Sequence, residues 1–204
     1  MSGTPRPEPS AGPAPAPPGR AARQARTRAR IVDAVTDLHA QVGPARTTVS
    51  AVARRAGVQR VTVYRHFPDE AALHGASGVA WLERSPLPDA DAWLAVPEPR
   101  QRTRVALAEV YDLYATGGAL LERLLRDRDQ VPALGPALGV LDAYLTASRE
   151  LLAHGWGVRG RRRRRLLAAL GHALAFATWR SLTAQEGLTD AEAADLMARM
   201  VEAC

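Results

Sequence analysis

The sequence predicts an all-α protein, and three features of its 204 residues support that fold class. Hydrophobic residues make up 47% of the chain but aromatic residues only 5%, which fits a helical protein rich in Ala and Leu. Apolar residues recur at spacings of three and four, whereas no segment alternates β-branched and polar residues as a half-buried strand would. Gly and Pro residues interrupt these patterns where helices are expected to end.

The first predicted helix covers residues 20–42, because its apolar residues form one stripe and Gly43-Pro44 then stops it. The stripe consists of Ile31, Val35, Leu38 and Val42. Residues 1–19 are rich in Pro, Ala and Gly and carry too little apolar surface to order themselves. They are therefore predicted to be a disordered tail.

Two short helices, 49–56 and 60–66, are predicted next, joined by a tight turn. Thr47 or Thr48 can cap the first by accepting a backbone N–H bond, and Gly57 can end it in a left-handed conformation. The second is polar and too short to be stable alone, so its few apolar residues must pack on a neighbour while its polar side faces outward. Two crossing helices with Gly in the turn form the helix-turn-helix motif, whose second helix enters a DNA major groove.

A fourth helix is predicted from Pro68 to about Arg84, with Asp69 and Glu70 in its first turn, where the helix dipole favours acids. The proline-rich residues 85–100 are predicted to be irregular. Later helices are predicted at residues 101–116, 119–128, 134–154, 162–186 and 190–203. Gly187 should end the penultimate helix, and Thr189 with Glu192 should form a capping box for the last.

The net charge of +6 is unevenly distributed along the chain. Residues 1–67 carry eleven Arg against three acidic residues, a net charge of +8. The remaining residues carry sixteen Arg against eighteen acidic residues, a net charge of −2. A basic segment joined to an acidic one is expected for a nucleic-acid binder with a separate regulatory body.

The composition also argues against several classes of protein. No apolar run approaches the roughly 20 residues needed to span a bilayer, and the N-terminus lacks the apolar segment of a secretory signal, so we expect a cytoplasmic protein with no membrane contact. Cys204 is the single cysteine, which excludes an internal disulfide and makes a cysteine metal site implausible. No Ser/His/Asp set, metal-spaced cluster or Gly-rich phosphate loop supports an enzyme, and no cofactor is expected.

The strings Ala56-Gly57-Val58 and Thr62-Val63-Tyr64-Arg65-His66-Phe67, ending at Leu73, resemble the tetracycline-repressor (TetR) family of bacterial regulators. The resemblance implies an N-terminal three-helix helix-turn-helix DNA-binding domain, residues 20–67, and a C-terminal helical effector-binding and dimerisation domain, residues 68–204. It further implies a ligand-responsive repressor that binds a near-palindromic operator in double-stranded DNA as a homodimer. An all-helical enzyme and a DNA scaffold protein without effector control are the alternatives.

Base reading is expected from the start of the second short helix, where Gln59 and Arg60 point outward first. Arg can pair two donors with guanine, and Gln can do the same with adenine. Val61 offers an apolar surface to a thymine methyl group. By resemblance, Ser50 lies near the groove and can reach a base or a phosphate.

The resemblance assigns DNA phosphate contacts to a group of polar residues around the second short helix. These are Thr48, Thr62, Tyr64 and His66, with Arg65 beside them. Tyr64 can also pack its ring on the first helix, and we expect both roles; His66 can instead be purely structural. The family usually carries Lys at the start of the fourth helix, where this chain has Glu70, so that phosphate contact is predicted to be missing.

An arginine arm precedes the motif on the first helix. Its members share one helix face, with Arg28 off that face, and they are Arg20, Arg23, Arg26 and Arg30. Because the arm adjoins a DNA-binding motif, we expect it to contact phosphates, each of which adds to the salt dependence of binding. The alternative is a solvated charged face.

The C-terminal half is expected to hold the dimer interface and the effector pocket. By resemblance the last two helices pair with a second copy, through Leu167, Leu170, Gly171, Leu174, Ala194, Met197, Ala198 and Val201; a monomer's own core is the alternative. The pocket candidates combine apolar area with polar tips, although each can also be ordinary core. They are Trp81, Tyr111, Tyr114, Leu121, Leu124, Tyr144 and Trp179. The run Arg159–Arg165 can be a second nucleic-acid patch, an anionic-ligand clamp or, as we favour, a solvated loop.

Overall fold

The computed structural model describes residues 19–204, and every regular element within that range is a helix, as the sequence predicts. The predicted disordered tail, residues 1–19, lies outside the described residues apart from Gly19. In chain order the elements, with short 3₁₀ helices marked η, are α1 (Arg20–Val42), η1 (Pro44–Arg46), α2 (Val49–Ala56), α3 (Arg60–His66), α4 (Glu70–Arg84), η2 (Asp91–Ala95), α5 (Pro99–Asp127), η3 (Pro132–Leu134), α6 (Gly135–Leu152), α7 (Gly160–Leu174), α8 (Phe176–Ala184) and α9 (Asp190–Glu202).

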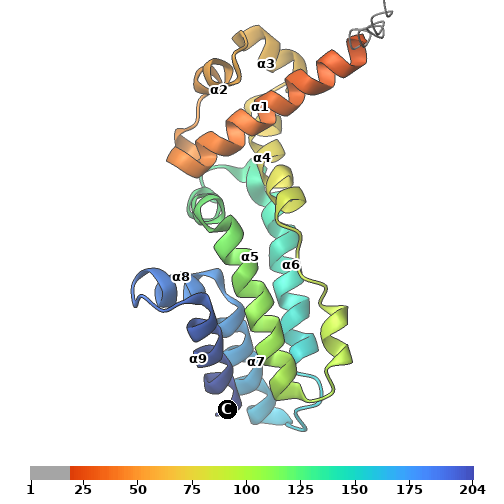
Figure 1. Ribbon diagram of the computed structural model, residues 1–204, viewed down its shortest axis with the longest axis vertical. Coiled ribbons are helices and arrows are strands. Elements are labelled where there is room, and N and C mark those ends of the chain that lie inside the picture. The colour runs from red at the N-terminus through yellow and green to blue at the C-terminus, as the bar shows by residue number, and fades with distance from the viewer. Residues whose placement is uncertain (1–18) are drawn as a thin grey trace, which may run out of the picture.

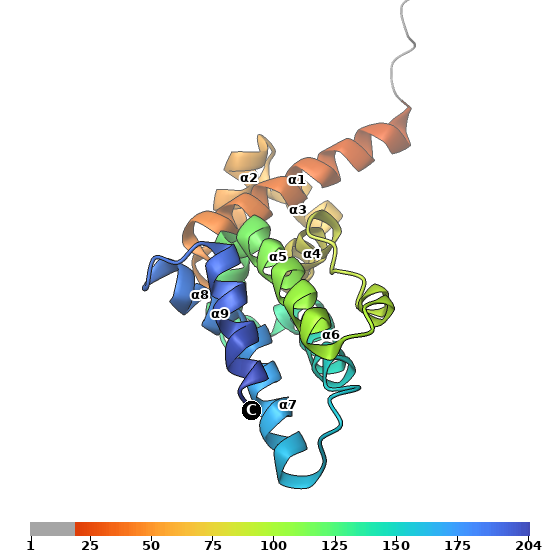
Figure 2. The same cartoon turned by 60° about the horizontal axis from the view of Figure 1, so that its bottom comes forward.

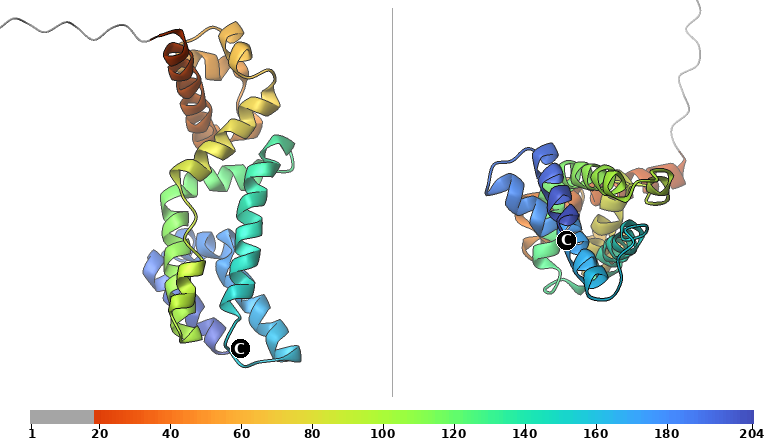
Figure 3. Two further views of the ribbon diagram at one scale, coloured as in Figure 1. Left: turned by 90° about the vertical axis from the view of Figure 1, so that its right-hand side faces the viewer. Right: turned by 90° about the horizontal axis from the view of Figure 1, so that it is seen from below.

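The molecule is elongated, with a head formed by α1 to α3 at one end and a body formed by α5 to α9 at the other (Figure 1). α4 leaves the head and runs into the body, where α5 and α6 lie side by side (Figure 3). α9 packs along α5, and α7 packs against both α6 and α9 (Figure 2). None of the helices in residues 19–204 combines the length and the apolar character that crossing a membrane requires.

The head and the body each have their own core, formed by two separate clusters of buried side chains. α4 serves both, because Leu73 in its first half belongs to the head core and Trp81 in its second half belongs to the body core. The predicted domain boundary between residues 67 and 68 falls in the short link between α3 and α4. Any movement of α4 relative to the body would therefore also move the head.

α5 is one continuous helix, whereas the sequence predicts two helices, 101–116 and 119–128, separated at Gly117-Gly118. The two glycines do not break the helix; they let neighbouring aromatic rings approach it. A Cβ atom at Gly117 would lie 2.6 Å from Nε1 of Trp81, and one at Gly118 would lie 2.9 Å from the ring of Trp179. Close packing, and not the end of a helix, accounts for both glycines.

α7 and α8 are two helices where the sequence predicts a single one, 162–186, and the break falls at the extended residue Ala175. Two tyrosines of α5 satisfy backbone carbonyl groups that the break frees: Tyr111 donates to Ala173 O at 2.9 Å and Tyr114 donates to Leu174 O at 2.7 Å. Phe176 then packs edge-on against Tyr114, with ring centroids 5.2 Å apart. The break is thus stabilised by residues about 60 positions away in the chain.

The proline-rich link between α4 and α5 is ordered by one buried tryptophan. Trp93 in η2 is buried, and its Nε1 donates to the carboxylate of Glu109 at 2.7 Å. Arg102 of α5 donates to the carbonyl oxygens of Val96 and Pro97 in the same link. Proline removes backbone donors, so side chains supply these contacts instead.

The predicted capping box at the last helix is present. The Glu192 N–H donates to Oγ1 of Thr189 at 3.3 Å, and the Thr189 N–H donates to the Glu192 carboxylate at 2.9 Å. Gly187, which adopts a positive φ of 73°, follows α8 in the connection to α9. The local signals at this boundary therefore predict the structure correctly.

Candidate nucleic-acid interface

α2 and α3 form the predicted helix-turn-helix, and local sequence signals set its geometry. Oγ1 of Thr48 accepts from the Ala51 N–H at 3.2 Å and so caps the start of α2. Gly57 ends α2 in the left-handed region, at φ 63° and ψ 40°, where a side chain would be strained. Val63 and Phe67 are buried in the head core and hold α3 on α1 and α2.

The opposite side of α3 faces outward, away from the body (Figure 1). Gln59, Arg60 and Val61 are exposed there, and Ser50 is exposed at the start of α2. Val61 leaves 51% of its surface exposed. An apolar side chain so exposed at the tip of the head does not serve the core, which leaves it free to contact a partner.

The residues predicted to contact phosphates surround this outward face. Thr48, Tyr64 and Arg65 are exposed, and Thr62 and His66 are half-buried. Tyr64 leaves 41% of its surface exposed, so its ring is only partly packed on the head. The Thr48 hydroxyl accepts the capping bond but keeps its own proton, which remains available for donation to a phosphate.

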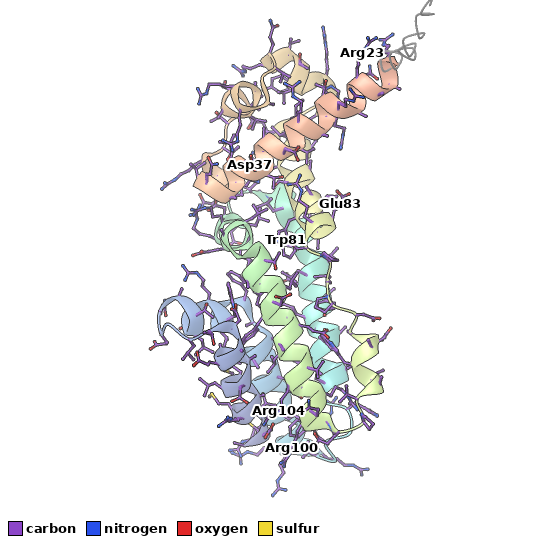
Figure 4. All side chains as sticks on the ribbon, in the orientation of Figure 1. Arg23, Asp37, Trp81, Glu83, Arg100 and Arg104 are labelled. Carbon is purple, nitrogen blue, oxygen red and sulfur yellow. The ribbon has the colours of Figure 1, made fainter. Side chains whose placement is uncertain are left out.

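The arginine arm does not act as one face, because its members have different neighbours. Arg20 and Arg23 line a surface groove of 680 Å³ together with Thr62, Arg65 and His66 of α3. Arg23 lies near the free N-terminal end of α1 (Figure 4). We call this feature the α1–α3 groove. It joins the arm and the motif into one basic surface.

Two arginines of α1 differ from the sequence prediction. Arg28, predicted to lie off the arm's face, lines the α1–α3 groove and stacks on the ring of Phe67 at 5.0 Å. Arg30, predicted to bind phosphate, donates to the carbonyl oxygens of Ala56 and Gly57 at the end of α2. A cation there satisfies carbonyls that the helix leaves unpaired, so Arg30 has a structural role in the head.

Acidic residues stand at the start of α4, next to the motif. Asp69 caps the helix by accepting from the Ala72 N–H at 2.7 Å, and Glu70 is exposed in the first turn. Two carboxylates repel a phosphate backbone at this end of the surface. The position of Glu70 thus carries no cation, and Arg65 is the nearest arginine before it in the chain.

Comparisons with known proteins agree with this geometry. Residues 31–76 match the family model described as "Bacterial regulatory proteins, tetR family". The matched segment contains α2 and α3, so the head is similar to the corresponding segment of TetR-family regulators. No curated protein sequence matches it significantly.

Solved structures share the fold of this protein at low sequence identity. A TetR-like transcriptional regulator from Rhodococcus sp. RHA1 is 19% identical, with 86% of this chain and 93% of that chain covered and a TM-score of 0.61. A TetR-family transcriptional regulator from Streptomyces coelicolor is 18% identical (88% and 80% covered, TM-score 0.60). A fatty acid degradation regulator from Bacillus halodurans is 16% identical (86% and 94% covered, TM-score 0.56). At these identities the likenesses show the fold, while the family model likens residues 31–76 to bacterial regulatory proteins.

The head is connected to the body at the C-terminal end of α1. Arg123 of α5 donates from Nε to the carbonyl oxygen of Ala40 at 2.7 Å. Asp127 of α5 accepts from the Ala45 N–H at 3.0 Å, and its hydrogen bond from Arg126 holds the pKa of its carboxyl below the usual value. These contacts fix one end of α1 against α5.

A buried histidine pair joins α1 to α4 near this point. Nε2 of His39 lies 2.9 Å from Nδ1 of His74, and the two rings stack with centroids 5.0 Å apart. Burial and, to a smaller extent, the neighbouring His74 lower the pKa of His39 to about 3, while Asp127 opposes the shift. Both rings are therefore neutral at pH 7, and the pair connects the head to α4 without charge.

The predicted pocket residues form the packed core of the body. Trp81, Tyr111, Tyr114, Leu121, Leu124 and Trp179 are all buried, and Tyr144 is half-buried. Their polar tips are mostly used within the chain, since Nε1 of Trp179 donates to Asp190 at 2.7 Å and both Tyr111 and Tyr114 donate to carbonyl groups of α7. Trp81 and Tyr144 are the exceptions, because Nε1 of Trp81 and the Tyr144 hydroxyl have no hydrogen-bond partner among residues 19–204. Trp81 also lines a surface pocket.

The predicted dimer residues require a correction. Six of them are buried within the chain's own core, namely Leu170, Leu174, Ala194, Met197, Ala198 and Val201. A side chain already enclosed by its own chain cannot contact a second copy, so the alternative of a monomer's own core holds for these six. Leu167 and Gly171 are partly exposed. The sequence pattern marks the apolar face of each helix but does not say whether that face meets its own chain or a partner.

The arginine cluster at residues 159–165 lies at the end of the body farthest from α3 (Figure 1). Its arginines are exposed on the first turns of α7, so the structure contradicts the predicted loop but agrees with solvent exposure. Arg163 forms an ion pair with Glu150 at 2.7 Å. The position separates this cluster from the helix-turn-helix by the whole length of the body.

Proposed function

We propose that this TetR-family regulator is a ligand-responsive repressor that binds a near-palindromic operator as a homodimer. The outward face of α3 carries the proposal, because Gln59, Arg60 and Val61 are exposed together on a helix that Val63 fixes to the head. A helix held in this way can lie in a major groove without losing its own packing.

Base recognition rests on the first residues of α3. Arg60 has two donors for the O6 and N7 atoms of guanine, and Gln59 can pair with adenine in the same two-point manner. Val61 meets a thymine methyl group, and Ser50 reaches a base or a phosphate from α2. These four residues would set the operator sequence.

Phosphate binding rests on the surface around α3 and on the α1–α3 groove. Thr48, Thr62, Tyr64 and His66 supply hydroxyl and imidazole donors, and Arg65 supplies charge. Arg20, Arg23 and Arg28 add three cations along the groove. Such contacts position the head on the duplex without reading its sequence.

Dimerisation would use the outer faces of the C-terminal helices, in place of the buried residues first predicted. Leu196 and Met200 lie one turn apart on α9 and are 40% and 53% exposed. Leu167 and Gly171 lie one turn apart on α7 and are partly exposed. A second copy of the chain would cover these apolar side chains and bring two reading heads to one operator.

The test is selection of bound sequences from random DNA, followed by footprinting of the selected duplex. A discrete two-fold footprint supports a dimeric regulator, whereas diffuse protection supports a scaffold protein and contradicts the proposal. Arg60→Ala should cost about 1–3 kcal/mol of discrimination at one base pair in each half-site. Arg161→Ala removes the same charge at the far end of the body and should leave the selected sequence unchanged.

A further inference from the structure

Two surface pockets meet along the side of α5 that faces α1 and α4. The upper pocket, of 310 Å³, is lined by Thr36 and Ala40 of α1 together with residues of α4 and α5. The lower pocket, of 550 Å³, lies between α5 and the segment that follows α4. Arg84, Ser85 and Thr116 line both, so the pockets form one continuous depression, which we call the junction groove. Figure 4 places Trp81 at this junction of head and body.

Two buried polar atoms at the upper end of the junction groove have no hydrogen-bond partner among residues 19–204. They are Nε1 of Trp81, whose side chain is 2% exposed, and Oγ1 of Thr36, which is 5% exposed. The other three tryptophans all donate, to Glu109, to the carbonyl oxygen of Leu152 and to Asp190. Because buried donors are almost always paired in folded proteins, the Trp81 N–H points to an acceptor that the chain itself does not provide.

Gly117 keeps the space beside this indole open. A Cβ atom at this position would lie 2.6 Å from Nε1 of Trp81 and 3.3 Å from Oγ of Ser85. Helix interiors disfavour glycine, so its presence within α5 needs a reason in the local packing. The close approach of the Trp81 indole to α5, where Trp81, Gly117 and Ser85 line the upper pocket, provides such a reason.

The lower end of the junction groove is acidic. Glu109 and Asp112 of α5 line it, and Asp112 forms no ion pair with any residue that the structure describes. Among residues 19–204, Arg84 is the one cation that lines the groove, and it is paired with Asp33 of α1. The carboxylates therefore favour a positively charged group at this end of the groove.

We propose that the junction groove binds a small organic cation and is the effector site of this regulator. The positive group lies near Asp112 and Glu109, the apolar part covers Leu113 and Leu120, and a hydrogen-bond acceptor meets the Trp81 N–H. The proposed ligand site depends only on the junction groove, whereas the effector role also depends on the proposed function. Since α1, α4 and α5 all line the groove, an occupant touches head and body together and changes DNA affinity by binding their two arrangements unequally.

The ligand site is tested on the free protein with procainamide, which joins an aryl amide to a protonated amine. Para-aminohippurate, with the same aryl amide and a carboxylate, is the matched anion. Four indole N–H signals are expected in nitrogen–proton NMR spectra, and Trp81→Phe identifies one of them. Procainamide should shift the Trp81 signal saturably, should bind more tightly than the anion, and should leave the signals of Trp156 and Trp179 in place. An unmoved Trp81 signal, or equal affinity for both probes, overturns the site.

Substitutions test whether the carboxylate of Asp112 binds the positive group of the ligand. Asp112→Asn should weaken procainamide binding by about two- to fivefold, the range expected for one exposed charge. Asp112 is exposed, so its loss does not threaten the fold. Glu186→Gln removes an exposed charge from the loop before α9 and should leave the affinity unchanged. Equal effects of the two substitutions would mean that only net charge matters, which contradicts the site.

The effector role is tested separately, by fluorescence anisotropy with the selected operator duplex. Saturating procainamide should change the affinity for DNA, and Asp112→Asn should reduce that response. A saturable Trp81 shift with unchanged DNA affinity would overturn the effector role while the ligand site stands. Failure to bind any selected duplex would contradict the proposed function, and the effector role with it, although the NMR titration would still decide the ligand site.

Discussion

The head and the body of this protein use their polar side chains in different ways. The head core consists mainly of aliphatic residues such as Ile31, Val52 and Val63. Its arginines lie on the surface, as do most of its hydroxyl groups apart from the buried Thr36 and Thr47. The body core contains tryptophans and tyrosines, and most of their polar tips bond to backbone carbonyls or acids inside the molecule. The head therefore presents its polar groups to a partner, whereas the body uses them to fix its own helices.

Among substitutions that test this contrast, the largest loss of stability is expected at the centre of the body. Tyr114 is fully buried, packs against Phe176 and Trp179, and donates to the carbonyl oxygen of Leu174. Tyr114→Ala should lower the free energy of unfolding by about 3–5 kcal/mol, because it removes a large ring and leaves a cavity. Urea unfolding followed by circular dichroism measures the change.

Tyr114→Phe is the matched control, because it keeps the ring and removes only the hydroxyl group. It should lower the free energy of unfolding by about 1–3 kcal/mol, the cost of leaving the Leu174 carbonyl unpaired. If both substitutions cost the same, ring packing would contribute little and the contrast between head and body would fail.

The same contrast explains which parts of the fold the sequence predicts. Thr48, Gly57 and the Thr189–Glu192 capping box act on neighbours within four residues, so local rules place them correctly. The continuity of α5 through Gly117 and the break at Ala175 depend on rings that are distant in the chain. No local rule contains that information.

The candidate DNA surface divides in a similar way. Helical geometry and the burial of Val63 are enough to predict that Gln59 and Arg60 face outward. The positions of Arg28 and Arg30 depend on how α1 crosses α2 and α3, which its own sequence does not reveal. The spacing of arginines on α1 therefore identifies a basic helix but not the role of each residue.

A second prediction concerns the histidine pair that joins the two regions. The pKa of His39 is about 3 in the folded chain, against 6.5 for an unperturbed histidine, so the unfolded chain binds more protons between these values. The contribution of neutral His39 to the free energy of unfolding should therefore be complete above pH 6.5. It should fall as the pH drops, by up to about 1.4 kcal/mol for each pH unit. His74 and Asp127 adjoin this ring and Glu70 adjoins His74, and their titration adds to the profile.

The measurement is urea unfolding between pH 7 and pH 5. His39→Gln keeps a donor toward His74 but cannot become charged, so its stability should depend less on pH than that of the parent protein. His154→Gln, which replaces an exposed histidine in the loop before α7, should keep the parent profile. If the stability of His39→Gln and of the parent protein changed equally with pH, the histidine pair would not be the source of the pH dependence.

A third prediction separates the members of the arginine arm by their neighbours. Arg20 and Arg23 line the α1–α3 groove, and Arg26 does not. Removing Arg20 and Arg23 together should weaken binding to specific and random duplexes alike and reduce the log–log salt slope by about 0.9 for each lost phosphate contact. Arg26→Ala on the same helix should change the slope less. An equal loss for each arginine would mean that the arm acts through its total charge and not through the groove.

The smallest effect on DNA binding is expected at the arginine cluster on α7. This cluster is positively charged like the arm but is not next to the helix-turn-helix. Arg161, Arg162, Arg164 and Arg165 lie on the first turns of α7, at the end of the body farthest from α3. Salt screens exposed charges that are separated by more than the Debye length of about 8 Å. Replacing all four by Ser should leave operator affinity within about twofold and raise the melting temperature slightly, because cations at a helix N-terminus oppose its dipole. Anisotropy and thermal unfolding measure the two quantities. A large loss of affinity would show that the body also binds nucleic acid. It would contradict the view that polar groups of the head contact a partner while those of the body bond within the molecule.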